Sequence, residues 1–167
     1  MENTQCAEPW VSKEWILDRY DIYKTMLFRI AFSYLGNRHD CEDILQEAFI
    51  RLCYKAPEFP SEEDEKRWLI RVTINLCKSQ LRSFWNRNKQ NIEGLELYAP
   101  EPEDKEILQE VLCLPANYKM VIYLHYIEGY KVAEIAKILK VSESAVKMRL
   151  KRGREHLKLE MEGLYEA

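Results

Sequence analysis

Cationic side chains are concentrated in one short segment near the C-terminal end of the chain. They are Lys147, Arg149, Lys151, Arg152, Arg154 and Lys158. Val146, Leu150 and Leu157 recur between them at the spacing of one helix face. A helix with one apolar stripe and a cationic remainder can pack on a core and still present its charges to nucleic-acid phosphates. The chemistry that this segment favours is therefore nucleic-acid binding.

A second helix is predicted immediately before this segment. Its apolar positions are spaced as on one face of an amphipathic helix, at Val132, Ile135, Ala136 and Leu139. Lys140 and Val141 interrupt the pattern, and Ser142 can cap the next helix through its side-chain oxygen. Two helices joined by so short a turn, with the second one basic, are typical of a helix-turn-helix. The second helix would then lie in a major groove and present side chains to the base edges and the phosphates. These side chains are Ser142, Glu143, Ser144, Lys147, Met148, Arg149, Lys151, Arg152 and Arg154.

Two residues fit this motif poorly. The turn position Lys140 is usually glycine, because the backbone there tends to be left-handed, and a lysine costs about 1 kcal/mol. Gly153 lies inside the second helix and costs about another 1 kcal/mol relative to alanine. Both are expected to loosen or re-aim the recognition helix. The alternative interpretation is a cationic pair of surface helices that binds no nucleic acid.

The net charge of −3 runs against nucleic-acid binding, but the charges are segregated along the chain. Residues 78–89 and 147–158 are basic, whereas residues 93–110 are acidic. Because the local potential decides where a polyanion binds, the negative net charge does not exclude nucleic-acid binding. A chain of 167 residues with 47% hydrophobic content permits one domain or two small ones.

The cysteines and the N-terminal segment favour a reducing, cytoplasmic setting. The five cysteines are odd in number and form no CxxC pair, which argues against a zinc site and a disulfide scaffold. Residues 1–10 do not read as a signal peptide, and no apolar run is long enough to span a bilayer. We therefore expect a cytoplasmic protein with no membrane insertion, no metal and no cofactor.

Helices are predicted throughout the N-terminal half. The first spans about 13–35 and stops at residues 36–37, where Gly-Asn supplies a turn. The second follows the expected N-cap Asp40 and ends in a proline-containing loop. Residues 61–66 (SEEDEK) are expected to form an acidic loop, and a third helix is expected over about 65–85.

Two polar faces of these helices are candidate binding surfaces. On the second helix, Asp43, Gln46 and Glu47 share the face opposite the apolar one, a pattern that alone favours mere solubility. The third helix interleaves aromatic and cationic residues, which suits single-stranded nucleic acid because rings stack on bases and cations follow phosphates. A core aromatic stripe with a solvated basic face explains that helix equally well. Phe59, in the loop before it, is either a plug on the core or a stacking surface.

The composition changes between the two halves of the chain. Residues 88–104 are acidic and contain proline and glycine, which predicts a flexible linker. A short helix is expected at 105–114 and another at 115–126, with Gly129 ending it before the helix-turn-helix. No β-pattern occurs, so the predicted fold class is all-α, with two small helical domains. Their expected bounds are 12–87 and 105–161.

This combination resembles an extracytoplasmic-function (ECF) sigma factor of the sigma-70 family, a promoter-recognition subunit of bacterial RNA polymerase. Residues 40–52 (DCEDILQEAFIRL) and 67–83 (RWLIRVTINLCKSQLRS) look like sigma region 2, and residues 114–158 look like region 4. No region 3 domain fits between 86 and 104. The resemblance implies a non-enzymatic protein that binds core polymerase and recognises the −35 and −10 promoter elements. It would initiate transcription of a dedicated, stress-response regulon.

Residue roles in region 2 follow from the resemblance. Asp43, Gln46 and Glu47 match the surface that docks on the clamp helices of the polymerase largest subunit, where polar groups give steering and register. Phe59 matches the loop that holds a flipped −10 base, and Asn75 matches a pocket residue beside it. The positions that meet the opening duplex are Trp68, Arg71 and Arg82.

In region 4 the resemblance assigns the −35 element to the second helix. Ser144, Lys147 and Arg149 are expected at base edges. Lys151, Arg152 and Arg154 are expected at phosphates, and Ser142 and Met148 complete the surface. The implied partners are promoter DNA, core polymerase through its clamp helices and flap, and an anti-sigma factor.

Other functions compete with this one. A stand-alone transcription regulator would explain the helix-turn-helix but not residues 40–83, and it would bind its promoter without core polymerase. A nucleic-acid enzyme would need Glu62, Glu63 and Asp64 as metal ligands, although the histidines are scattered and give no base–nucleophile arrangement. A purely α-helical interaction module leaves the basic helix unexplained.

Overall fold

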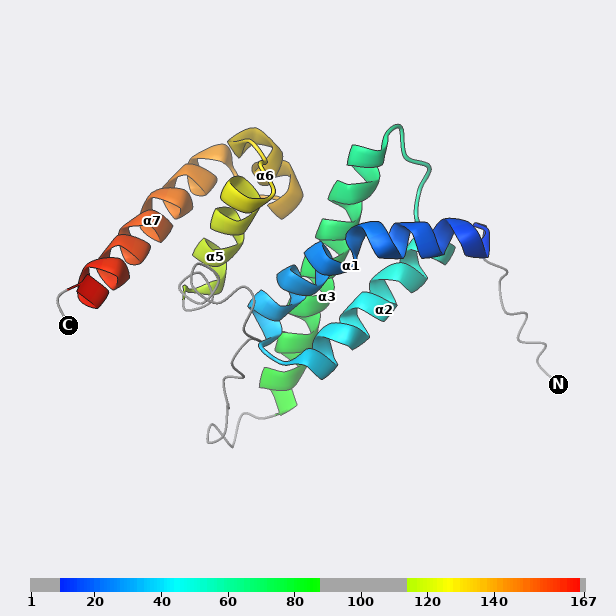
Figure 1. Ribbon diagram of the computed structural model, residues 1–167, viewed down its shortest axis with the longest axis horizontal. Coiled ribbons are helices and arrows are strands. Elements are labelled where there is room, and N and C mark those ends of the chain that lie inside the picture. The colour runs from blue at the N-terminus through cyan, green and yellow to red at the C-terminus, as the bar shows by residue number, and fades with distance from the viewer. Residues whose placement is uncertain (1–9, 88–113, 166–167) are drawn as a thin grey trace. The chain divides into compact units, whose positions relative to one another are not determined.

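The computed structural model describes residues 10–87 and 114–165, with side chains described up to Phe84 in the first range and Lys158 in the second. Every regular element in these two ranges is a helix (Figure 1). The contacts divide the chain into two compact units, Met1–Gly94 and Leu95–Ala167. The predicted all-α fold with two helical domains is therefore confirmed. No helix in the described ranges is both long and apolar enough to cross a bilayer.

Some predicted features fall where the structure gives no description. The linker over 88–104 lies outside the described residues, and so does the helix over 105–114 apart from Leu114. The detailed bounds 12–87 and 105–161 for the two domains accordingly remain predictions.

The first unit consists of α1 (Lys13–Leu35), α2 (Arg38–Lys55) and α3 (Glu62–Arg87), which all pack on one another (Figure 1). Each helix contributes an apolar stripe to a common core, so none of the three buries its apolar face alone. The largest fully buried side chains of this core include Leu27, Ile30, Leu52, Leu69 and Ile70.

The turn between α1 and α2 differs from the prediction in one respect. Gly36 adopts a left-handed conformation (φ 70°) and its N–H donates to the Phe32 carbonyl at 2.9 Å, which ends α1 as expected. The N-cap of α2 is Asn37 rather than Asp40, so that prediction was wrong. The Asp40 N–H donates to Asn37 Oδ1 at 2.9 Å, and the Asn37 amide donates back to Asp40 Oδ2 at 2.7 Å. The two side chains cap the helix reciprocally, much as in a capping box.

The third helix begins earlier than its apolar pattern suggested. Ser61 caps it, because its Oγ accepts from the Asp64 N–H at 3.2 Å and its hydroxyl donates to the Asp64 carboxylate at 2.6 Å. The prediction that residues 61–66 form an acidic loop is wrong: from Glu62 onward they are the first turn of α3. Carboxylates are favoured in that position by the positive end of the helix dipole.

The second unit consists of α5 (Ala116–Ile122), the π-helical turn η2 (Tyr123–Ile127), α6 (Val132–Leu139) and α7 (Glu143–Tyr165). Pro115 immediately precedes α5, and Gly129 (φ 75°) ends the helical run before α6. Both α5 and α6 pack on α7, and the fully buried side chains include Met120, Val121, Leu124, Ile135 and Val146. The predicted single helix over 115–126 thus closes with a π turn that its sequence did not reveal.

Candidate functional site

The turn between α6 and α7 has the geometry of a helix-turn-helix. Lys140 adopts the left-handed conformation (φ 54°, ψ 48°), as the position in the motif predicted. The Val141 N–H donates to the Ala136 carbonyl at 3.0 Å and so satisfies the end of α6. Ser142 then caps α7, its Oγ accepting from the Ala145 N–H at 3.2 Å.

Apolar side chains fill the angle between the two helices and fix their mutual direction. Ile135 and Val146 are completely buried, and Ala136 is small where α6 approaches α7. Ile138 is also buried, which the predicted stripe did not include, whereas Leu139 is only half-buried. The recognition helix is therefore held by packing as well as by its cap.

Gly153 is a packing residue and not a weak point. A Cβ at this position would lie 2.8 Å from Cγ1 and 3.1 Å from Cδ1 of Ile122 in α5. Gly153 is buried, and α7 continues through it without a break. The missing side chain lets α5 and α7 approach closely, a role that helix propensity alone did not indicate. The effect of Gly153 on the direction of the recognition helix stays a prediction.

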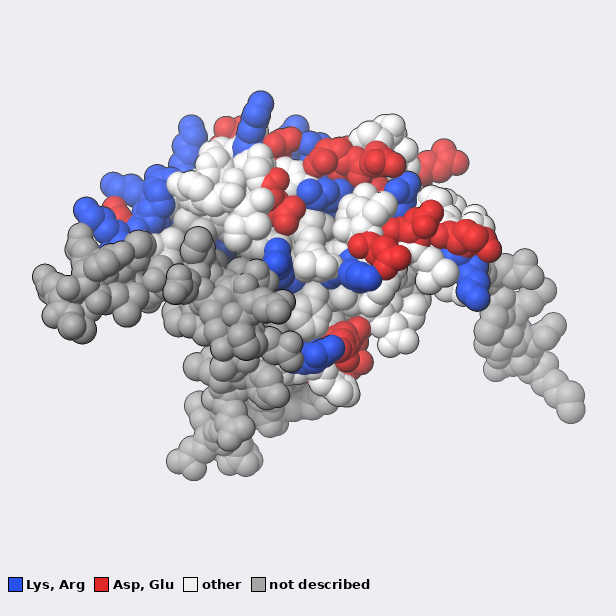
Figure 2. All heavy atoms as spheres, viewed as in Figure 1, with Lys and Arg blue, Asp and Glu red and all other residues white. Residues whose placement is uncertain are grey.

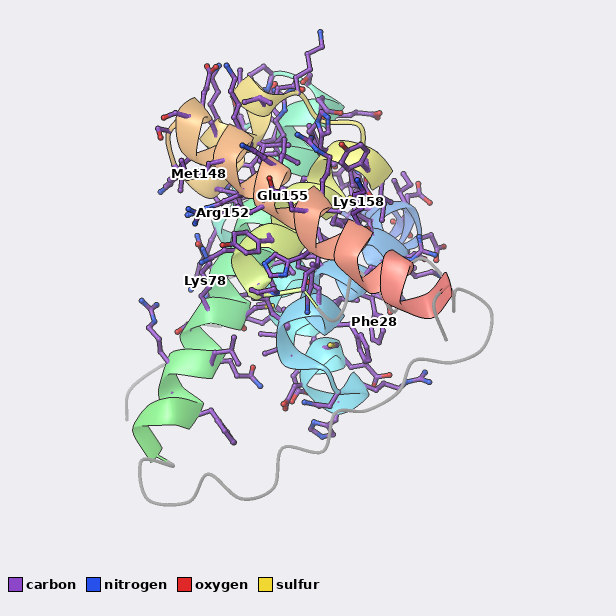
Figure 3. The ribbon with its side chains drawn as sticks, turned by 90° about the vertical axis from the view of Figure 1, so that its left-hand side faces the viewer. Phe28, Lys78, Met148, Arg152, Glu155 and Lys158 are labelled. Carbon is purple, nitrogen blue, oxygen red and sulfur yellow. The ribbon has the colours of Figure 1, made fainter. Side chains whose placement is uncertain are left out.

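The outer face of α7 carries most of the residues predicted to contact the −35 element. Figure 2 shows lysine and arginine gathered over this helix, and Figure 3 shows Met148 and Arg152 along its outer face. The exposed members are Ser142, Ser144, Lys147, Met148, Lys151, Arg152 and Arg154. Arg149 is half-buried on the flank of the helix. The exposed set forms a cationic surface with two hydroxyls at its N-terminal end, a composition suited to phosphates and base edges.

The residues predicted to meet the −10 element share one face of α3. Trp68, Arg71, Asn75 and Arg82 are spaced at i, i+3, i+7 and i+14, which places them in one stripe. Lys78 is also exposed and lies between Asn75 and Arg82 in the same stripe, although no contact with the −10 element was predicted for it (Figure 3). Phe59 is half-buried, its ring centre 5.7 Å from that of Trp68 in an edge-to-face arrangement. The aromatic pair therefore lies at one end of a polar and basic stripe.

The first turn of α3 is tied to α1 by a buried ion pair. Arg19 Nε lies 3.0 Å from Oε1 of Glu65, which is almost completely buried. The same guanidinium lies 3.5 Å from Glu62 and over the ring of Trp15.

Burial raises the pKa of Glu65, while Arg19 opposes the rise. Burial, followed by the nearby Glu65 charge, raises the pKa of Tyr23 to about 12. This cluster fixes the start of the helix that carries Trp68.

The acidic–amide surface of α2 is accessible, as a docking surface must be. Asp43 and Gln46 are exposed, and half-buried Glu47 accepts from Arg51 Nε at 2.8 Å. The surface continues along the same helix through two apolar residues, Ile50 and Tyr54, which are 43% and 45% exposed. These two residues were not predicted as part of the surface, since their spacing alone does not separate them from core positions.

Two acidic clusters on this unit do not form a convincing metal site. Ligand atoms of His39, Asp40 and Asp43 lie within 4.8 Å of one another, but they are on the surface and Asp40 already caps α2 with Asn37. The enzyme hypothesis used Glu62, Glu63 and Asp64 as ligands. Their carboxylates, all in the first turn of α3, instead pair with Arg19 of α1, with Arg67 and with Ser61, respectively.

Comparison with known protein families agrees with this geometry. Residues 19–87 match the family described as Sigma-70 region 2, and residues 104–157 match Sigma-70, region 4. The ECF RNA polymerase sigma factor SigW of Bacillus subtilis (strain 168) is 34% identical, with 88% of this chain and 89% of SigW covered. SigX of the same organism, also named an ECF sigma factor, is 26% identical, with 88% and 84% covered.

Solved structures show the same fold. The sigma factor RpoE of Bartonella quintana, determined with the anti-sigma factor NepR, superposes with a TM-score of 0.75 at 18% identity, covering 90% of this chain and 98% of RpoE. CnrH, determined with the cytosolic domain of CnrY, gives a TM-score of 0.64 at 19% identity, covering 91% and 90%. Both likenesses concern the arrangement of helices.

Proposed function

The chain belongs to the ECF class of the sigma-70 family, and on that premise we propose that it binds core RNA polymerase and directs it to promoters with dedicated −35 and −10 elements. The observation that carries the proposal is the pairing of two surfaces in one chain. One is the cationic face of α7 in a capped helix-turn-helix, and the other is the aromatic and basic stripe of α3. Promoter initiation needs both duplex reading and capture of an opened strand.

For the −35 element we assign the helix-turn-helix. Ser142, Ser144, Lys147, Met148 and Arg149 lie in the first two turns of α7 or at its cap, which is the part of a recognition helix that enters the major groove. The phosphate contacts go to Lys151, Arg152 and Arg154 further along. The half-buried position of Arg149 makes it the least accessible of these residues.

For the −10 element we assign Phe59 together with Trp68, Arg71, Asn75 and Arg82. An unstacked base loses a few kcal/mol of stacking, which an aromatic pocket with polar edges can partly replace. The Phe59–Trp68 pair supplies apolar surface, and the exposed Asn75 amide lies two turns further along α3.

For core polymerase we assign Asp43, Gln46 and Glu47, which would meet basic groups on the clamp helices. The flap would be the second contact of the polymerase. An anti-sigma factor is a further expected partner, since the structural neighbour RpoE was determined with the anti-sigma factor NepR. We further infer that the protein acts in the cytoplasm, catalyses no reaction itself and serves a stress-response regulon.

The test is runoff transcription with purified bacterial core polymerase on a library of promoter fragments, with and without the protein. Specific transcripts that require the protein, and disappear with the triple change Asp43→Ala, Gln46→Ala and Glu47→Ala, are the expected result. The matched control is Glu14→Ala with Asp18→Ala, which removes two exposed carboxylates from α1 and should leave transcription intact. Sequence-specific binding of duplex DNA by the protein alone, without any stimulated transcription, would instead favour a stand-alone regulator.

A further inference from the structure

A tyrosine outside the recognition helix joins its cationic face. Lys147, Lys151, Arg154 and Lys158 are spaced at i, i+4, i+7 and i+11 and form one exposed stripe along α7. Arg154 Nη1 donates a hydrogen bond of 3.1 Å to the hydroxyl of Tyr126, a residue 28 positions earlier in the chain. Tyr126 is 55% exposed, so its ring stands in solvent beside this stripe. Figure 3 shows Lys158 further along the same helix.

The position of Tyr126 is produced by the π turn. The Glu128 N–H donates to the Tyr123 carbonyl at 3.1 Å, five residues back, and the Tyr130 N–H donates to the Leu124 carbonyl at 2.9 Å. The His125 ring, bonded through Nδ1 to the Tyr130 carbonyl at 2.8 Å, lies edge-to-face with Tyr126 at 4.9 Å. Single π turns occur frequently at functional sites, where they redirect a side chain. Here the turn directs Tyr126 toward α7.

The hydrogen bonding of the pair leaves donors to spare. The Tyr126 oxygen accepts from Arg154, so its own O–H hydrogen can be donated to another acceptor. The Arg154 guanidinium has five N–H groups in a planar fork and uses one of them on Tyr126. Two donors from different helices therefore converge beside a row of lysines, which is an arrangement suited to a singly charged phosphate diester.

We propose that Tyr126 and Arg154 together bind one backbone phosphate of the −35 duplex, with Tyr126 supplying a neutral hydrogen bond and holding the arginine in place. This inference rests on the proposed function, and it adds to the −35 surface a residue from outside the helix-turn-helix. The arginine releases a counterion when it meets the phosphate, whereas the tyrosine does not. The two contributions consequently differ in their dependence on salt.

The experiment uses the full chain in complex with core polymerase and measures the dissociation constant for promoter DNA over a range of sodium chloride concentrations. Tyr126→Phe should weaken binding about five- to tenfold with an unchanged salt slope, as expected for one lost hydrogen bond. Arg154→Gln should weaken binding and make the slope shallower by about 0.9. Tyr118→Phe is the matched control: it makes the same change in the same unit, on a ring that lies against His156.

Neutral methylphosphonate linkages, placed at one −35 phosphate at a time, locate the contact. At one of these positions, the neutral linkage should weaken binding of the wild type. The same linkage should weaken binding of the Tyr126→Phe and Arg154→Gln variants much less. The proposal would be overturned if Tyr126→Phe bound promoter DNA with unchanged affinity. It would also be overturned if the two variants lost their sensitivity to methylphosphonate at different phosphates. A wild-type complex that shows no dependence on the −35 sequence would instead refute the proposed function itself. Because these readouts compare DNA positions, a purely structural role of Tyr126 would not reproduce them.

Discussion

At the scale of single residues, Lys140 meets the strongest conformational demand in the helix-turn-helix. Among the described non-glycine residues it alone has a positive φ, 54°. An L-residue in this conformation brings its Cβ too close to the following carbonyl, at a cost of about 1–2 kcal/mol. The surrounding contacts offset that strain. The left-handed turn in return sets the direction in which α7 leaves α6.

Replacing this lysine by glycine should stabilise the second unit. We expect Lys140→Gly to raise its free energy of unfolding by about 0.5–1 kcal/mol, since glycine adopts positive φ without strain but loses more chain entropy. Hydrogen exchange of amides in α6 and α7 measures the change locally. The control Lys137→Gly, at an exposed position inside α6, should lower the same quantity by about 1 kcal/mol. A destabilising Lys140→Gly would contradict the argument.

A second residue-scale prediction concerns the buried carboxyl of Glu65. Its pKa is raised in the folded state, so the folded protein binds this proton more tightly than the unfolded chain does. The stability contributed by protonated Glu65 is therefore present below the unfolded pKa of about 4.3 and is lost as pH rises through the folded pKa. Wild type should lose stability relative to Glu65→Gln as the pH increases over this window.

Denaturant unfolding of both proteins at a series of pH values measures that difference. The Glu14→Gln change, in the exposed first turn of α1, controls for the loss of one negative charge. A wild type that gains stability over Glu65→Gln with rising pH would show that the attraction of Arg19, 3.0 Å away, outweighs the effect of burial.

At the scale of helices, apolar periodicity predicted which segments form helices. The features that it did not predict depend on contacts between residues far apart in the sequence. The apolar stripe of 13–35 matched α1, and the capped turn at Ser142 matched the start of α7. The role of Gly153 was not predictable, because it depends on Ile122, which lies on another helix. The π turn is closed by backbone hydrogen bonds, and Tyr126 accepts a hydrogen bond from Arg154 on another helix; neither feature leaves a local mark in the sequence.

The packing of α5 on α7 leads to a prediction at this scale. Gly153→Ala should lower the free energy of unfolding of the second unit by about 1–3 kcal/mol, because the new methyl group overlaps Ile122. Helix propensity alone would give the opposite sign, a gain of about 1 kcal/mol. Ile122→Ala removes the overlapping atoms, so in that background Gly153→Ala should cost much less. Chemical denaturation followed by circular dichroism compares the four proteins, and a stabilising Gly153→Ala would refute the close-approach argument.

At the scale of the whole molecule, charge is divided in a way that suits the proposed role. The net charge is −3, yet lysine and arginine gather over α7 (Figure 2). Acidic residues dominate the first turn of α3, and the basic side chains Arg71, Lys78 and Arg82 lie further along the same helix. A protein of this kind binds DNA through local potential and not through its overall charge. The sequence allowed this division to be predicted, because the basic and acidic segments are separate along the chain.

The division into two units, each with a core of its own, predicts that they unfold separately. All four tryptophans lie between Trp10 and Trp85, so tryptophan fluorescence follows the first unit alone. Leu52→Ala empties a fully buried site in that unit and should lower its stability by about 2–5 kcal/mol, which moves the fluorescence transition. Leu124→Ala empties a fully buried site in the second unit. It should move only the unfolding transition that circular dichroism detects and tryptophan fluorescence does not. If Leu124→Ala shifted the fluorescence transition equally, the two units would unfold as one, and the −35 and −10 surfaces would have to approach promoter DNA as a single body.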